Sequence, residues 1–381
     1  MTRSSIYIPR QSDLATSELV SLIEDPMIRA LMQSYTDLEA RPPAQQIRNH
    51  SQVKFMNFTD EQIDEAVGIV LAADEGSGAT GDGEDGDSRQ RFLREEFTVI
   101  REPKKEQDLE IRSVLPDQYE GWVAEHFEKI MLVDKLRETR ALVGFTRLYE
   151  ENDMSQAELK SMLRAKAPSH RNENWLPAYN VFGEGIFFEF KESLVSEWEN
   201  KPDVISRLNP LIERYIAAQI KRQSSQIHLS PRFVMLHTFA HVLINSLTFE
   251  CGYSSASLRE RLYVSDDPER PMAGVLIYTA SGDADGTMGG LVRMGKPGFL
   301  EPVIKSALVE AKWCSADPIC MEVGEAGGQG PDSCNLAACH NCALVPETSC
   351  EIFNKILDRA TIIGALDGNP QGFFEGGLFR R

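Results

Sequence analysis

The stretch SPRFVMLHTFAHVLINSLTFECG, Ser230–Gly252, predicts a long helix that is buried on nearly every side. Ser230 is a favoured N-cap residue, Pro231 suits the first helical position, and glycine at 252 ends the pattern. The residues of the predicted helix are apolar on nearly every side, as in helices that lie inside a protein core. We therefore expect the C-terminal part of the chain to pack around this helix.

Shorter patterns on either side of this helix predict a mixture of helices and strands. AGVLIYTA (Ala273–Ala280) is apolar almost throughout, which is typical of a buried strand, and a glycine-rich turn follows it. The other predicted elements are a helix over 122–131, a pair of strands in NVFGEGIFFEF (Asn180–Phe190), a helix over 205–220 and a helix over about 302–313. These patterns predict an α+β fold that is rich in helices.

Composition limits what the chain can do alone. Its 381 residues are 42% hydrophobic, which is enough for a real core and suggests two or three domains. The 40 basic and 58 acidic side chains give a net charge of −18, whereas proteins that grip phosphates unaided usually carry a basic excess. Any DNA contact must therefore be local or made by a partner. Since no signal-peptide or membrane-helix pattern is found, we expect a soluble, cytoplasmic protein without membrane contact.

A composition break divides the chain near its first quarter. Residues 74–87, DEGSGATGDGEDGD, hold six acidic residues, five glycines and no basic residue. Such a segment cannot bury enough apolar area to offset its ordering entropy, so it is predicted to be a disordered linker, with a long solvated loop as the alternative. The predicted domains are an N-terminal helical module, the linker, a mixed α/β middle domain, a zinc-binding domain and a C-terminal tail: 1–73, 74–90, 91–227, 228–365 and 366–381. Within the first module the predicted buried positions are Leu19, Leu22, Ile28 and Leu31.

Six of the seven cysteines lie between 314 and 350, and this clustering predicts a metal site. Cys339 and Cys342 form a CxxC turn, which can place two thiolates on one tetrahedral zinc ion. Cys314 and Cys320 would complete a four-cysteine shell. A redox function for the CxxC is the alternative, although it would need the motif to open a helix after a strand.

The choice of ligands among the six cysteines stays open at this point. Cys334 and Cys350 are surplus if four cysteines bind zinc. Cys350 is the stronger rival, because it lies at the predicted start of a helix over 350–360, where a helix N-terminus favours the thiolate. His340, next to Cys339, is a weaker substitute because neighbouring side chains on such a turn usually point apart.

A second set of residues has features of a catalytic site. His237 and His241 in HTFAH are four residues apart, on one face of the predicted helix, as in zinc proteases. The position of the general-base glutamate holds Thr238, so we interpret the two histidines as buried side chains satisfied by hydrogen bonds. A zinc-dependent hydrolase that also uses Asp283 or Asp285 is the alternative. No complete active site is recognisable elsewhere, which predicts that the chain is not an enzyme.

Basic residues in two places are candidates for phosphate contact. Arg293 and Lys296, just beyond the glycine-rich turn, are the best local candidates for contact with DNA. In LRETRALVGFTRL (Leu136–Leu148), three arginines lie among apolar residues and suit either phosphate contact or ion pairing. Ion pairing is favoured there, with Glu138 and Glu184 as the available partners.

Several of these stretches together resemble a known family. VMLHTFAHVLINSL, YTASGDADGTMGGLVRMGKP, WCSADPIC and LAACHNCALVPETSCEIFN resemble the C-terminal MZB-type domain of the DrmB family, the helicase-associated component of DISARM anti-phage systems. LRETRALVGFTRL and WLPAYNVFGEGIFFEF resemble the same family, and the resemblance covers residues 119–364. The usual N-terminal region of that family, with a motif such as RRSQ, is not found before Asp74. Either the chain is a short branch or another subunit supplies that region.

The resemblance also implies a ligand set and a function. A more distant similarity to the zinc-binding domain of MrfA-type helicases places Cys339 and Cys342 in the CxxC turn and assigns Cys314 and Cys320 as the other ligands of a structural Zn²⁺. The implied function is that of a non-catalytic accessory subunit of an antiviral defence complex. Its partner would be a DrmA-like superfamily-two helicase, with DNA bound through the complex and no small-molecule substrate. A pure protein scaffold without DNA contact is the further alternative.

Overall fold

The computed structural model describes residues 2–8, 82–142, 177–222, 227–254, 256–279, 290–323 and 327–375, with scattered positions between 19 and 67. The chain divides into two compact units, Pro9–Val99 and a larger one made of Met1–Ile8 and Ile100–Arg381. In the smaller unit, Leu19 and Ile28 are buried and Leu22 is partly buried, as predicted. Leu31 lies outside the described residues.

The acidic, glycine-rich segment is helical where the structure describes it. Helix α5 spans Asp82–Ile100 and therefore includes the second half of the predicted linker. The prediction of disorder is wrong from Asp82 onward, and residues 74–81 lie outside the described part.

The larger unit contains an antiparallel sheet, which has seven strands within the described residues. Its order is β2-β3-β4-β5-β7-β6, and β1 also pairs with β4. The strands are β1 (Thr2–Tyr7), β2 (Lys104–Lys105), β3 (Leu109–Val114), β4 (Phe127–Leu142), β5 (Ala178–Phe190), β6 (Leu258–Ser265) and β7 (Met272–Thr279). β7 is buried at every position, in agreement with the predicted buried strand.

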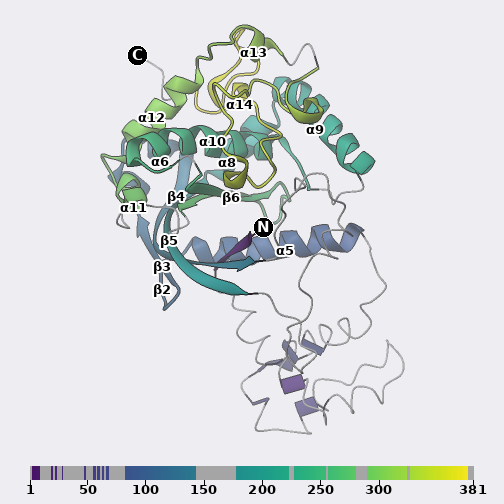
Figure 1. Cartoon of the computed structure of the whole chain (residues 1–381), viewed down its shortest axis with the longest axis vertical. Coiled ribbons are helices and arrows are strands. Elements are labelled where there is room, and N and C mark those ends of the chain that lie inside the picture. Colours follow the sequence, from purple (N-terminus) through teal and green to yellow (C-terminus); the bar gives the residue numbers. More distant parts are fainter. Residues whose placement is uncertain are drawn as a thin grey trace. The chain divides into compact units, whose positions relative to one another are not determined.

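Helix α10, Pro231–Cys251, is the centre of the core. It contacts β6 and β7 on one side and α12 and α14 on others, so that it lies between the sheet and the C-terminal segment (Figure 1). Residues 232–244 are all buried, and Gly252 ends the helix with a left-handed φ of 69°. The predicted central helix is confirmed.

The larger unit contains further helices besides α10. They are α6 (Gly121–His126), α8 (Glu192–Glu199), α9 (Pro202–Arg222), α11 (Gly290–Met294), α12 (Leu300–Ala311), α13 (Ile319–Glu322) and α14 (Ala360–Ile363), with 3₁₀ turns η1 (Pro116–Gln118), η4 (Pro331–Ser333) and η5 (Glu347–Ser349). The helices expected over 205–220 and 302–313 correspond to α9 and α12. The predicted α+β class with its C-terminal cysteine cluster is confirmed. None of the helices within the described residues combines the length and apolar character needed to cross a membrane.

Three predicted elements differ from the structure. The helix expected over 122–131 ends at His126, and β4 begins at Phe127. A short, mostly apolar run cannot be assigned to a helix or a buried strand from its sequence pattern alone, which is why the prediction extended the helix too far. The strand pair expected in 180–190 is the single strand β5, which has register shifts against β4. The helix expected over 350–360 does not form, since Phe353, Asn354 and Ile356 have positive φ.

Two predicted boundaries also differ from the structure. The middle and zinc-binding regions, separated at 227/228, share one sheet, because β5 pairs with β7. The predicted tail is part of the core as far as it is described, since Phe373 and Phe374 are buried against the ring of Phe190. Backbone hydrogen bonds from Phe373 and Phe374 to Thr361 and Ile362 also attach this segment to the core.

Candidate metal centre

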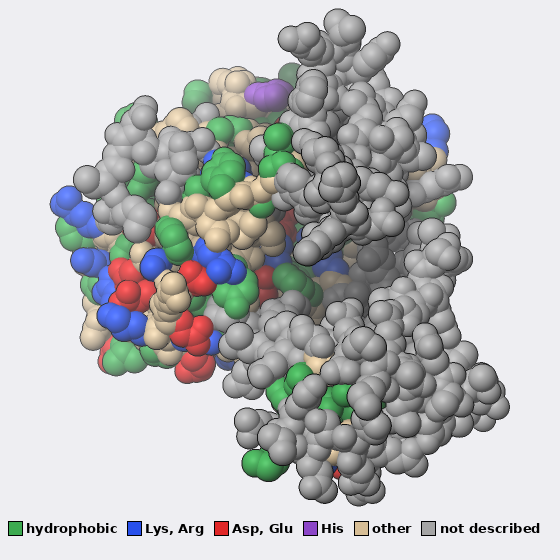
Figure 2. All heavy atoms as spheres, turned by 60° about the horizontal axis from the view of Figure 1, so that its bottom comes forward, with side chains coloured by type: hydrophobic (Ala, Val, Ile, Leu, Met, Phe, Trp, Pro, Cys, Tyr) green, Lys and Arg blue, Asp and Glu red, His purple; other side chains and the backbone are tan. Residues whose placement is uncertain are grey.

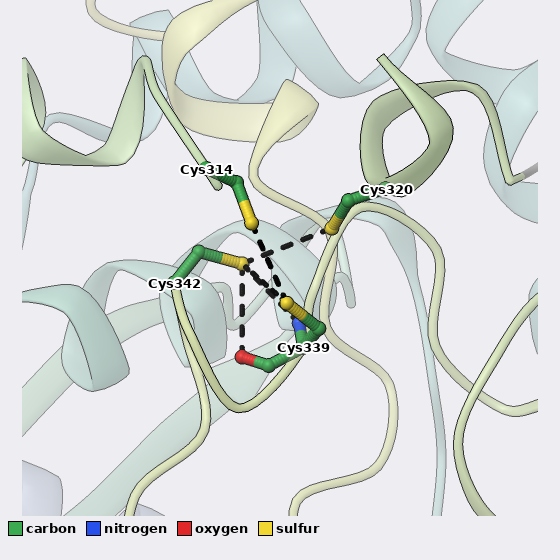
Figure 3. Close-up of side chains that lie close together, drawn as sticks. All are labelled: Cys314, Cys320, Cys339 and Cys342. Atoms are coloured by element: carbon green, nitrogen blue, oxygen red, sulfur yellow. Dashed lines mark hydrogen bonds between the residues drawn. The ribbon is translucent and has the colours of Figure 1, made fainter. Parts of the chain in front are cut away.

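The structure brings together four predicted ligands, Cys314, Cys320, Cys339 and Cys342 (Figure 3). Their sulfur atoms all lie within 4.8 Å of one another. The first follows the end of α12, the second lies in α13, and the last two lie on the CHNC turn. Segments that are separate in sequence thus meet at one point.

The spacing of the sulfurs fits a tetrahedral zinc ion. The Sγ–Sγ distances are 3.5 Å for Cys314–Cys339, 3.7 Å for Cys339–Cys342 and 3.9 Å for Cys320–Cys342. Four sulfurs at about 2.3 Å from zinc would lie about 3.8 Å apart, whereas a disulfide needs about 2.05 Å. All four cysteines are free thiols. The arrangement is that of a metal shell and not of a cross-link.

The backbone of the CHNC turn aims its two thiols at the same point. The carbonyl of Cys339 accepts hydrogen bonds from the N–H groups of Cys342 and Ala343, both at 3.1 Å. The N–H of Cys339 in turn donates to Sγ of Cys342 at 3.2 Å. The motif therefore lies on a tight turn and not at the start of a helix, which is unlike the arrangement that the redox alternative requires.

A short loop fixes the other pair of cysteines. The N–H of Cys314 donates to the Asp317 carboxylate at 2.8 Å, and the N–H of Asp317 returns to the Cys314 carbonyl at 2.9 Å. The N–H of Cys320 donates to the Ala316 carbonyl at 3.0 Å, at the start of α13. This reciprocal pattern closes the loop, so that both thiols face the CHNC turn.

Arg359 and Gln329 contact the cysteine cluster and the loops that carry it. Arg359 is fully buried and donates to the carbonyls of Ala311 (2.7 Å) and Ala337 (3.1 Å) and to the carboxylate of Asp317 (2.8 Å). Gln329 Nε2 donates to Sγ of Cys320 at 3.4 Å. Four thiolates and one Zn²⁺ carry a net charge of −2, so a buried guanidinium nearby offsets part of it.

The electrostatics of the cluster favour thiolate formation at one sulfur. The hydrogen bond from the Cys342 thiol, with burial opposing it, and the contacts with Gln329 and Arg359 lower the pKa of Cys320 to about 5. Burial raises the pKa of Cys314. For Arg359, burial opposes the charged form, but Cys342 and Asp317 raise its pKa. The guanidinium is therefore held as a cation beside the sulfurs.

The other candidate ligands of the cluster lie elsewhere. His340 is exposed and does not belong to the group of four. Cys334 is fully buried, and its thiol donates to the Asp332 carbonyl at 3.4 Å. Cys350 follows η5 in extended backbone and lies beside His237, with 3.2 Å between Nε2 and Sγ. It is therefore not positioned as a substitute in the four-cysteine shell.

His237 and His241 are fully buried on α10, as interpreted, but within the described residues Nε2 of His241 has no hydrogen-bond partner, so the expectation that both rings are fully satisfied is wrong. Their neighbours are Cys350 and Glu260 of β6, a residue that the sequence reasoning missed. A signal was available, because Glu260 is a carboxylate on the face of the strand that also carries Leu258 and Leu262. Asp283 and Asp285, the acidic residues of the hydrolase alternative, lie outside the described residues.

The basic candidates divide into two groups. Arg293, at the end of α11, and Lys296 are both exposed, and the Arg293 guanidinium lies 5.0 Å from the ring centre of Phe299. Two arginines of the middle region are ion-paired as favoured: Arg137 with Asp108 at 2.6 Å and Arg140 with Glu138 at 3.1 Å. Arg147 lies outside the described residues. Glu184 accepts hydrogen bonds from the N–H groups of Leu291 and Val292 and so anchors the start of α11.

Comparison with known proteins gives two matches. Residues 239–343 match the family described as MZB, MrfA Zn-binding domain. The range contains the four clustered cysteines and ends before Cys350. A DISARM protein DrmB from Bacillus paralicheniformis is 35% identical over 284 residues, which is 74% of this chain. The chain is a DrmB relative.

This relationship confirms the family resemblance predicted from the sequence. The chain carries a zinc-binding domain, and its four-cysteine cluster can hold the zinc ion. The match covers 48% of the DrmB protein, so the chain spans about half the length of this relative. The activity and partners of the whole protein are therefore a matter for proposal.

Proposed function

We infer that this DrmB-like chain is a non-catalytic accessory subunit of a bacterial anti-phage defence complex. The match to a DISARM protein over 284 residues carries the proposal. The partner is a DrmA-like superfamily-two helicase, and DNA is bound through the complex. Cys314, Cys320, Cys339 and Cys342 hold a structural zinc, because four protein sulfurs complete a tetrahedral shell and leave no position for a substrate.

Arg293 and Lys296 are the proposed DNA contact. Gly295 between them lies against Leu132 of β4, and a side chain there would clash with it. The Tyr119 hydroxyl also donates to the Gly295 carbonyl at 2.6 Å. Two exposed cations are thus presented on a backbone fixed to the sheet, which suits phosphate contact.

The charge of the chain requires such a contact to be local. Figure 2 shows one face, on which basic and acidic side chains of the described residues are interspersed. Together with the net charge of −18, this favours a few phosphate contacts that supplement those of a partner, and not autonomous DNA binding.

The hydrolase alternative has no comparable support among the described residues. His237 and His241 are completely buried, whereas a catalytic zinc needs an open coordination position that substrate can reach. The scaffold alternative differs from the proposal only in DNA contact. The experiment below therefore has to measure both helicase binding and DNA affinity.

Co-expression with a DrmA-like superfamily-two helicase tests the proposal. We expect stoichiometric co-purification. We also expect Arg293→Glu with Lys296→Glu to weaken DNA binding by the complex and to reduce the slope of log affinity against log salt by about 2. The matched control is Lys105→Glu with Arg270→Glu, which makes the same charge change at exposed residues elsewhere.

The outcomes separate the proposal from the scaffold alternative and from a general effect of charge. Failure to recover the helicase would contradict the accessory function. Co-purification with unchanged DNA affinity in the Arg293 and Lys296 variant would support a scaffold. An equal loss in the control variant would show a general charge effect and would contradict a local contact at this site.

A further inference from the structure

A second cluster of metal-binding residues lies in the core, apart from the four cysteines. His237 and His241 extend from successive turns of α10, Glu260 from β6, and Cys350 from the segment after η5. One ligand atom from each lies within 4.8 Å of those of the others. The histidines are fully buried, and Glu260 and Cys350 are 2% and 8% exposed.

Hydrogen bonds fix which nitrogen of each histidine faces the cluster. Nδ1 of His237 lies 3.2 Å from the Ile356 carbonyl, and Nδ1 of His241 lies 2.9 Å from the Ala343 carbonyl. Because a carbonyl oxygen only accepts hydrogen bonds, the Nδ1 atom of each ring carries a proton. In the neutral ring Nε2 then has a free lone pair and is an acceptor. Histidines that bind metals through Nε2 are oriented in this way.

When Cys350 is a thiolate and Glu260 a carboxylate, the groups facing one another at the centre are all acceptors. Nε2 of His237 lies 3.1 Å from Oε1 of Glu260 and 3.2 Å from Sγ of Cys350. Within the described residues, Nε2 of His241 and Oε2 of Glu260 have no hydrogen-bond partner, although both are buried. They lie 3.7 Å apart. Buried acceptors that converge in this way are stabilised by a positive species among them.

We propose that His237, His241, Glu260 and Cys350 bind a second divalent metal ion, with zinc as the preferred ion. Two neutral imidazoles, a carboxylate and a thiolate balance the charge of one M²⁺. A mixed nitrogen, oxygen and sulfur set of four suits tetrahedral zinc. A single ion would also satisfy both unpaired atoms at once.

The surroundings of the two anionic ligands agree with this assignment. Sγ of Cys350 accepts hydrogen bonds from the N–H groups of Ile352 (3.4 Å) and Asn354 (3.2 Å), which stabilise a thiolate. Oε1 of Glu260 accepts one from the N–H of Glu351 at 3.1 Å. The segment after η5 therefore supplies one ligand and supports another. The positive φ values at Phe353, Asn354 and Ile356 allow this winding.

The competing arrangement replaces the metal by protons. Burial opposes a charge on His237, but Glu260 and Cys350 raise the pKa of His237 well above its usual value. Two imidazolium rings would then balance the carboxylate and the thiolate. The same four side chains form both arrangements, and only one of them contains a metal ion. Measurement of the metal content therefore decides between them.

The proposed second site is structural and not hydrolytic. Four protein ligands close the shell, and all of them are buried, so no coordination position is open to water or substrate. The ion would join α10, β6 and the segment after η5, which otherwise has little regular structure. This inference stands on its own contacts and is independent of the proposed defence function.

Metal content and zinc X-ray absorption of the 381-residue chain, equilibrated with buffered zinc, test the proposal. We expect about two zinc ions per chain and a first shell that averages between two and three sulfurs, with nitrogen or oxygen making up the rest. One zinc with four sulfur ligands in the wild-type chain would overturn the proposal. That outcome needs no variant.

Variants then assign the ion to these residues. Cys350→Ser should lose about one zinc and shift the shell toward four sulfurs. Cys334→Ser is the matched control, because Cys334 is also buried but belongs to neither cluster. Two zinc ions retained in folded Cys350→Ser, or an equal loss in Cys334→Ser, would refute the assignment. If Cys350→Ser does not fold, the wild-type shell still decides the question.

Discussion

Replacement of Arg359 by methionine tests how the interior of the zinc-binding domain supports its cysteines. The guanidinium is 0% exposed, and it joins Asp317 on the Cys314–Cys320 loop to the carbonyls of Ala311 and Ala337. Methionine keeps most of the volume but leaves a carboxylate and two carbonyls without their donor. Breaking a buried ion pair in this way costs about 3–5 kcal/mol, a large share of the stability of an ordinary domain.

Zinc affinity should fall in the same variant. Arg359 offsets part of the negative charge of a zinc-thiolate centre, and loss of such a supporting residue typically weakens metal binding by about 10–100-fold. Urea unfolding measures the stability, and competition with a chromophoric chelator measures the zinc affinity. The control is Arg270→Met, which removes an exposed arginine whose ion pair with Asp267 lies on the surface. If Arg359→Met matched this control in both assays, the reasoning would be refuted.

Two further predictions concern the core and its pH dependence. Phe374→Ala should destabilise the larger unit by about 3–5 kcal/mol, because the ring is fully buried against His126 and Phe239. Phe249→Ala, at an 86% exposed position, should change urea stability by less than about 0.5 kcal/mol, and equal effects would contradict the core assignment of residues 373–374. The Asp266 hydrogen bond raises the pKa of His228, and the same bond lowers the pKa of Asp266. The ion pair therefore stabilises the fold fully between the usual Asp pKa of 3.8 and the usual His pKa of 6.5. This stabilisation is lost as the pH rises through the raised pKa of His228, or as it falls through the lowered pKa of Asp266. Because both side chains are partly exposed, it should be below about 1 kcal/mol. Asp266→Asn should flatten the loss of urea stability above neutral pH, and an unchanged pH profile would argue against this pair.

The elements that could be predicted from sequence are those with a strong local signal. Helix α10 has an N-cap, a proline and a terminal glycine around an apolar run, and the CxxC spacing itself specifies a tight turn. The four-cysteine group depended on the family resemblance as well, because six cysteines allow many sets. Only the structure separated Cys350 from the other five, by placing it beside His237.

The remaining features depend on contacts between distant segments. Glu260 lies in an ordinary strand pattern, and its proximity to α10 follows from the packing of β6 against that helix. The winding after Cys350 and the burial of Phe374 likewise follow from tertiary contacts that override local propensity. A buried carboxylate on an apolar strand face was the one signal that could have led to the second cluster.

The most direct test of the central claim is the zinc content of Cys339→Ser with Cys342→Ser beside that of the wild-type chain. Native mass spectrometry of the folded proteins counts the bound ions. If the four cysteines hold the structural zinc, the double variant carries one zinc fewer per chain. An unchanged zinc content in the folded double variant would contradict the account.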